Sequence, residues 1–152
     1  MSNWRADITE ALAAFVKVAE LSGVPIPKDE FEVVFLEGPH KSPTSLPYGK
    51  MAIYGFWGDG TWLKIGMAGA KSQARYTSQH YNRGSALSTL AASLAGDPRM
   101  SNVAGFDAAA PGAWIKSSCH RVNILLSTKY ARSMLAMLEA FLHIRLRPRY
   151  EG

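Results

Sequence analysis

The sequence predicts an α/β fold of the α+β type: a small antiparallel three-stranded sheet flanked by helices, with an N-terminal helical extension. Three observations support this prediction. Two strand-like runs enclose a turn signal, amphipathic helix patterns lie near both ends, and the 152 residues are 47% hydrophobic and 19% charged. That length and composition suffice for a buried core and exclude a disordered chain.

The first predicted element is an amphipathic helix over residues 7–22. Apolar residues recur there at the spacing of one helix face, namely Ile8, Ala11, Leu12, Phe15, Val16 and Ala19. Asp7 and Glu10 have the spacing of a capping box, and Gly23 and Pro25 end the helix. The chain is therefore expected to open with a helix that has one apolar side.

A short strand-like run, residues 31–36, comes next. Residues 38–49 then contain three prolines and little apolar content, which predicts a loop or linker. His40 lies in this loop and has no partner visible in the sequence. The change in composition places a domain boundary near residue 48, so that 1–48 form an N-terminal helix and linker extension and 49–152 form the main domain.

The clearest local signal is a β-hairpin. Met51–Trp57 and Thr61–Gly66 are strand-like, and Gly58-Asp59-Gly60 lies between them. Asp-Gly tolerates the positive φ angles of a tight hairpin turn. Trp57 and Trp62 flank the turn, where they are expected to pack as a cross-strand pair. Stacking on nucleic-acid bases is their alternative role.

Two short helices and an irregular insert are predicted after the hairpin. Ser72 is placed near the N-cap of a helix over residues 72–81, which Asn82-Arg83-Gly84 breaks. The spacing of Leu87, Leu90 and Leu94 predicts a second helix that stops before Asp97. Residues 98–112 are rich in Gly, Ala and Pro and are predicted to be irregular.

A strand and a long helix complete the predicted fold. The stretch from Trp114 to Leu126 contains a strand, best defined over 122–126. Ser127 or Thr128 then caps a helix that Pro148 ends, and its apolar stripe is Tyr130, Met134, Met137, Leu138, Phe141 and Leu142. Cys119 and His120 are adjacent in the predicted strand and point to opposite faces, so a structural role is expected for both.

The charge distribution indicates an acidic partner. Seventeen Lys and Arg against twelve Asp and Glu give a net charge of +5, and only Asp97, Asp107, Glu139 and Glu151 lie beyond residue 60. A basic domain favours nucleic acid as its partner, so a polyanion site belongs in the chain from Lys64 onward. The single cysteine suits a reducing cytoplasm, and no stretch is long and apolar enough for a membrane span.

Glu139 is the most unusual polar residue. It lies inside the apolar run Met134–Leu142. A carboxylate in such surroundings is costly unless it is paired, hydrated or bound to a metal. Pairing with Arg132 or His143, or contact with water at a helix edge, is the structural alternative to a functional role.

Five landmarks in order resemble the GIY-YIG nuclease family. Ala52-Ile-Tyr54 and Leu63-Lys-Ile-Gly66 are similar to its two signatures, Arg75 follows nine residues after Gly66, and Glu139 lies in the late helix. The run from Glu139 to Tyr150 resembles the end of the nuclease domain of the excision-repair member. The resemblance covers about residues 50–152, or two thirds of the chain.

This resemblance implies a metal-dependent endonuclease that hydrolyses phosphodiester bonds in DNA with Mg²⁺ or Mn²⁺. By family analogy, Tyr54 is the general base or orients the water, Arg75 clamps the phosphate and Glu139 is the metal ligand. Lys64 takes the place of a signature tyrosine and would stabilise charge. These roles are chemically coherent, because a cation and an arginine neutralise the charge that develops on phosphorus.

Four departures from the family pattern affect the predicted site. Ala52 replaces a glycine and Lys64 replaces a tyrosine. The family often has His or Tyr four residues after the arginine, where this chain has Gln79, followed by His80 and Tyr81. An early end to the helix would favour His80 as the residue that completes the site. Glu151 replaces an asparagine that braces the site in the family.

Two rival functions remain open at this stage. A catalytically impaired module with the same fold would bind nucleic acid without cutting it. An unrelated basic α/β protein would match the motifs by accident. The sequence does not choose between duplex, branched and single-stranded DNA or RNA. Nor does it distinguish repair, restriction and mobile-element roles. Recognition of the substrate by a homodimer is one further alternative.

Overall fold

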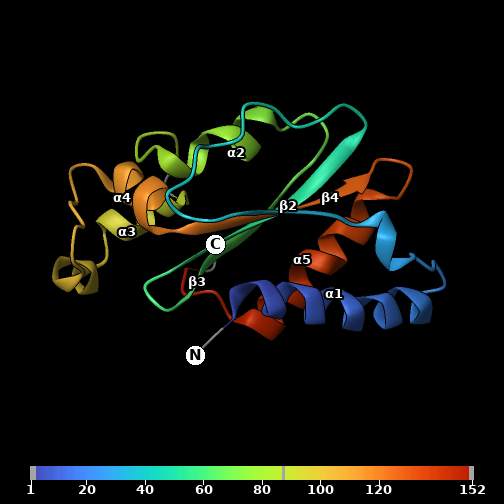
Figure 1. Ribbon diagram of the computed structural model, residues 1–152. Helices are drawn as coiled ribbons and strands as arrows, with labels where there is room; N and C mark the ends of the chain where they lie inside the picture. The colour runs from blue at the N-terminus through green and yellow to red at the C-terminus, as the bar shows by residue number, and fades with distance from the viewer. Residues whose placement is uncertain (1–2, 87, 151–152) are drawn as a thin grey trace.

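The computed structural model describes residues 3–86 and 88–150 and confirms an α+β fold (Figure 1). The helices are α1 (Trp4–Leu21), α2 (Gln73–Thr77), α3 (Leu90–Ala95), α4 (Pro111–Ser118) and α5 (Arg132–Leu146). The strands are β1 (Glu32–Leu36), β2 (Lys50–Gly58), β3 (Thr61–Ala68) and β4 (His120–Ser127). Three short 3₁₀ segments are η1 (Lys28–Glu30), η2 (Gln79–Tyr81) and η3 (Pro98–Asn102).

The sheet has four strands in the order β1-β4-β2-β3, and every neighbouring pair is antiparallel. The predicted count of three was therefore wrong. The additional strand is β1, the short run that the sequence placed in the N-terminal extension. It pairs with β4, with Val34 opposite Asn123. No local pattern reveals such a pairing, because the partner strand comes almost ninety residues later in the chain.

The predicted hairpin is confirmed. Asp59 and Gly60 have φ angles of 50° and 75°, as the central residues of a tight type I′ turn require. Trp57 and Trp62 are opposite each other, as expected. Immediately afterwards the register shifts, and Phe56 pairs with Lys64. Leu63 is therefore the extra residue of a β-bulge, which turns the side chains of Leu63 and Lys64 to the same face.

Helices cover both faces of the sheet (Figure 1). On one face α1 and α5 pack over a core that includes Phe15, Trp62, Ile124 and Leu138. On the other face α2, α3 and α4 cover a second core that includes Tyr54, Phe56, Leu90 and Trp114. The two cores share the central strands, so side chains that alternate along β2 are divided between them.

Several helices differ from the sequence expectation. Helix α5 has Ala131 as its N-cap, so the predicted cap at Ser127 or Thr128 was wrong. The N-cap of α1 is Asn3, whose Oδ1 accepts a hydrogen bond from Ala6 N at 3.1 Å, and the predicted cap at Asp7 was wrong. Helix α4 occupies a stretch assigned to the irregular insert and the next strand, because Pro111 starts a helix at a position where its missing N–H costs nothing. Leu87, a predicted helix residue, lies outside the described residues.

The C-terminal segment returns to the sheet after α5. Arg149 N donates to Trp62 O at 3.0 Å and Tyr150 N donates to Leu63 O at 2.9 Å. The Tyr150 hydroxyl donates to Asp97 at 2.6 Å. The segment after α5 is thus fixed along the outer edge of β3. In the described part of the chain, no helix has the length and apolar character to cross a membrane.

Candidate active site

Tyr54 lies in the middle of β2, fully buried, on the face covered by α2 and α3. Its register partner on β3 is Gly66. A Cβ at position 66 would be only 2.5 Å from the Tyr54 hydroxyl oxygen and 2.7 Å from Cζ. Glycine at position 66 therefore gives the tyrosine ring room to cross beneath β3 and present its hydroxyl at the sheet edge.

His80 contacts that hydroxyl. Helix α2 ends at Thr77, and His80 follows in η2, where its Nε2 lies 2.6 Å from Tyr54 Oη. Leu90 N donates to His80 Nδ1 at 3.0 Å. Burial, followed by the charges of nearby Lys64 and Arg75, lowers the pKa of His80 to about 3. The ring is therefore neutral near pH 7 with its one proton on Nε2, and it donates to Tyr54.

Arg75 supplies a second donor to the same oxygen. Its Nε donates to Tyr54 Oη at 3.1 Å, while the residue as a whole is exposed on α2. The Tyr54 oxygen thus accepts from both His80 and Arg75, and its own proton must point elsewhere. Burial raises the pKa of Tyr54, and the charge of Arg75 and its hydrogen bond act in the opposite direction. Two donors on one oxygen favour its phenolate form, but burial is the larger effect, so the pKa is raised overall and the phenol keeps its proton near pH 7.

Lys64 is buried on the same face because of the β-bulge. Lys64 is only 5% exposed, and its charge contributes to the lowered pKa of His80. Three cations therefore act on His80, those of Lys64, Arg75 and Arg121. Such a concentration of positive charge suits a phosphate group, because it would offset the desolvation of the anion.

Glu139 approaches from the other helical layer. It is half-buried on α5, and its charge is close enough to raise the pKa of Tyr54. Across residues 3–86 and 88–150, no group of three or more His, Cys, Asp or Glu side chains is placed to hold a metal. Mg²⁺ is commonly bound by one or two carboxylates together with water and phosphate oxygens, so a single Glu139 fits that ion. His143, the predicted alternative partner, donates from Nε2 to Ile65 O at 2.8 Å.

The structure settles which of three neighbouring residues reaches Tyr54. His80 does so, whereas Tyr81 faces a second cluster and Gln79 is half-buried in η2. The early helix end that the sequence made a condition for His80 is observed, at Thr77. Glu151, the departure at the bracing position, lies outside the described residues.

A second tyrosine–histidine pair lies beside the first, and sequence reasoning missed it. His40 Nδ1 donates to Cys119 O at 2.9 Å, and its Nε2 lies 2.8 Å from Tyr81 Oη. Burial lowers the pKa of His40. In the neutral ring the proton is therefore on Nδ1, and Nε2 accepts the Tyr81 proton. The Cys119 thiol itself is buried, and burial raises its pKa to about 12.

Arg121 joins the two pairs. It is 1% exposed, and its guanidinium lies 5.1–5.8 Å from the ring centres of Tyr54, Phe56, Tyr76 and Tyr81. It donates to Asn123 Oδ1 at 2.8 Å, Tyr81 Oη at 3.1 Å and Tyr76 O at 2.6 Å. These acceptors are neutral, so the charge of Arg121 is available to Tyr54 and His80. Its two-residue spacing from Asn123 on β4 is the signal that could have placed both on one face.

Comparison with known proteins gives no match: none of the family models, curated proteins or solved structures that were searched matches this chain.

Proposed function

We propose that this chain is a metal-dependent endonuclease that hydrolyses phosphodiester bonds in DNA. The observation that carries the proposal is the Tyr54 hydroxyl, whose oxygen is held by His80 and Arg75 at 2.6 Å and 3.1 Å. The surrounding cations and the nearby Glu139 carboxylate add the charges that phosphate chemistry needs. RNA is the alternative substrate.

In this mechanism Tyr54 acts on the attacking water. Its hydroxyl first releases its own proton to solvent. The phenolate oxygen then takes a proton from the attacking water, the resulting hydroxide forms the new bond to phosphorus, and the bond to the leaving oxygen breaks as that oxygen takes a proton from solvent. His80 and Arg75 hold the oxygen during the transfer by donating to it. The outer part of the exposed Arg75 guanidinium is left to contact the phosphate.

The remaining roles are electrostatic. Glu139 would hold a divalent ion, which neutralises phosphate charge when it is bound. Lys64 is buried and so acts through its charge on the site rather than as a mobile surface group. The Arg121 guanidinium lies against the Tyr54 ring, and its charge helps to lower the pKa of His80. Each charge is thus assigned to a side chain whose position is fixed by the sheet or by a helix packed on it.

A cleavage assay tests the proposal. Plasmid, duplex, branched and single-stranded DNA, with an RNA strand beside them, would be incubated with Mg²⁺, Mn²⁺ or EDTA. We expect metal-dependent cutting that falls at least ~100-fold in Glu139→Gln. Glu20→Gln, on the exposed side of α1, is the matched control and should cut like the wild type. Equal cutting by both variants would contradict the role of Glu139.

A binding module without cleavage is the second candidate, and one observation favours it. Burial raises the pKa of Tyr54, which opposes its use as a base. This candidate predicts salt-sensitive binding of DNA that persists in EDTA, with no cutting of any of the substrates above. Cutting by the wild type that is absent from Glu139→Gln would exclude it.

A further inference from the structure

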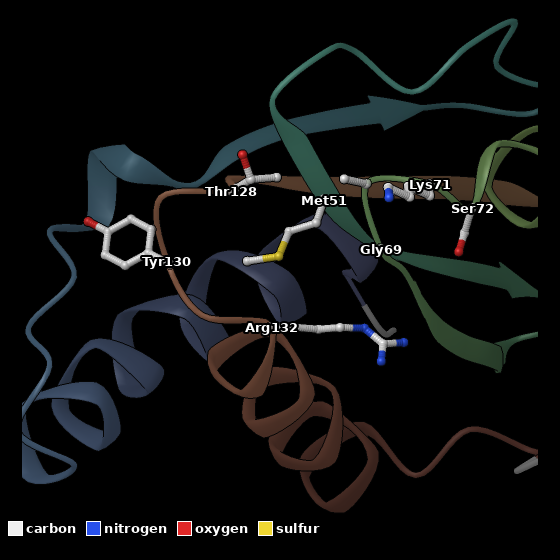
Figure 2. A pocket seen from close by; sticks show the side chains of 8 residues that line it. Met51, Gly69, Lys71, Ser72, Thr128, Tyr130 and Arg132 are labelled. Atoms are coloured by element: carbon white, nitrogen blue, oxygen red, sulfur yellow. The ribbon is translucent and has the colours of Figure 1, made fainter.

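A groove lies at the end of β3 away from the hairpin turn, between the β3–α2 loop and the start of α5. Its volume is about 410 Å³. Met51 and Gly69 line its apolar part, and Lys71 and Arg132 bring positive charge to it. Figure 2 shows Arg132 reaching from the first turn of α5 toward the Gly69 segment, with Tyr130 at the other end. We call this feature the Lys71–Arg132 groove.

The groove adjoins the candidate active site through two elements. Ser72 lines the groove and directly precedes α2, which carries Arg75. Arg132 begins α5, which carries Glu139 seven residues later. Seven residues of α-helix are close to two full turns, so Arg132 and Glu139 lie on nearly the same face, about 10 Å apart along the axis. The groove and the proposed metal ligand therefore lie along the same face of α5.

The lining has the chemistry of a nucleotide site. Lys71 and Arg132 are exposed, and among residues 3–86 and 88–150 no Asp or Glu lines the groove. Cationic side chains contact backbone phosphates, and Arg offers two parallel donors to phosphate oxygens. The apolar wall at Met51 and Gly69 is a surface on which a base or sugar packs, and Tyr130 lies at the end of the groove away from Arg132. An acidic peptide would match the cations but leave the aromatic and apolar wall without a defined contact.

We propose that the Lys71–Arg132 groove binds the substrate strand a few nucleotides to one side of the scissile bond, with a backbone phosphate between the two cations and the adjoining nucleotide against the apolar wall. Phosphates of one strand advance about 3.4 Å per nucleotide along a duplex. The separation along α5 therefore places the bound phosphate about three nucleotides from the cut. This inference rests on the proposed function and adds a position on the strand to it.

Binding measurements in EDTA test the groove without requiring cleavage. The probe is a fluorescein-labelled DNA duplex of about 20 base pairs, with the same strand alone as a second probe. Arg132→Gln and Lys71→Gln should each weaken binding about 5-fold or more and reduce the salt slope by about one unit each. Arg145→Gln, at the other end of α5, and Lys17→Gln on α1 remove the same charge elsewhere on the surface and are the matched controls.

The outcomes separate the groove from the catalytic proposal. If the chain cuts DNA, the groove variants should raise KM and leave kcat within about 2-fold, because phosphate positioning is uniform binding. If the chain binds without cutting and the groove variants weaken that binding, the groove is a strand-binding site and the endonuclease proposal fails. Groove variants with the affinity and salt slope of their controls would overturn the groove while leaving the cleavage result intact. If neither the duplex nor the single strand binds, both the groove inference and the endonuclease proposal are overturned.

Discussion

Two tyrosine–histidine pairs lie on the same face of the sheet, and their hydrogen bonds run in opposite directions. In the Tyr54–His80 pair the histidine donates, because Leu90 N–H occupies its Nδ1. In the Tyr81–His40 pair the histidine accepts, because its Nδ1 donates to Cys119 O. In each pair, the backbone contact at the histidine Nδ1 therefore decides whether the tyrosine proton is used in the tyrosine–histidine hydrogen bond.

The difference identifies which tyrosine is suited to chemistry. Tyr54 Oη receives two donors and keeps its own proton available, whereas the Tyr81 proton is held by His40. Arg121 contacts both rings, so nearby positive charge does not distinguish them. The direction of the hydrogen bond does distinguish them, and three measurements test whether this difference matters for function.

The largest expected effect comes from removing each hydroxyl in turn. Tyr54→Phe should lower the cleavage rate by about 10³-fold, since it removes the proposed base. Tyr81→Phe should change the rate by less than about 3-fold, because Tyr81 makes structural bonds. Single-turnover cleavage at saturating enzyme measures both. Equal losses in the two variants would remove the functional distinction between the pairs.

Gly66→Ala should disturb the first pair and spare the second. The added Cβ would lie 2.5 Å from Tyr54 Oη, so the ring must move away from His80. We expect a loss of about 100-fold in cleavage rate from misplacement of the hydroxyl, and a decrease of ~2 kcal/mol in the free energy of unfolding from overpacking. Rate assays and urea unfolding measure these.

Gly84→Ala is the control for that substitution. Its Cβ would have its nearest neighbour, Asn82 Oδ1, at an ordinary 3.5 Å. We expect the wild-type rate and stability to be retained. A Gly66→Ala protein as active as Gly84→Ala would mean that the position of the Tyr54 hydroxyl does not limit cleavage.

Stability should also depend on pH through His80. The pKa of His80 is about 3 when folded and near 6.5 when unfolded. Between these values the unfolded state binds more protons, so the stabilising contribution is complete above pH 6.5 and is lost as the pH falls toward 3. Each pH unit inside the window should cost about 1.4 kcal/mol from this residue.

Urea unfolding at pH values between 7 and 4 measures that slope. His80→Gln should reduce it, because glutamine does not titrate. His40→Gln should reduce it less, since the Cys119 carbonyl favours the protonated ring and opposes the effect of burial on the His40 pKa. Identical slopes for wild type and His80→Gln would contradict the buried neutral state of His80.

Local sequence signals predicted local structure well. The hairpin followed from Asp59-Gly60, whose positive φ angles define the turn. The prediction of His80 depended on an early helix end, and the structure has that end at Thr77. In each case the physical cause lies within a few residues of the feature it explains.

Features that depend on distant partners could not be predicted. Strand β1 joins the sheet through β4, and His40 meets Tyr81 across 41 residues of sequence. Lys64 faces the site because a bulge at Leu63 shifts the register, which a simple alternation does not encode. Helix α4 was overlooked because its start is a proline within an Ala- and Gly-rich stretch.

The docked C-terminal segment also affects how the protein behaves at high concentration. β3 is an outer strand, and an outer strand with open backbone groups is a template for strand-to-strand association between molecules. Here Arg149 N, Tyr150 N and the His143 ring bind the carbonyls of Trp62, Leu63 and Ile65. These residues thereby occupy carbonyl groups of β3 that would otherwise be open to a strand of another molecule.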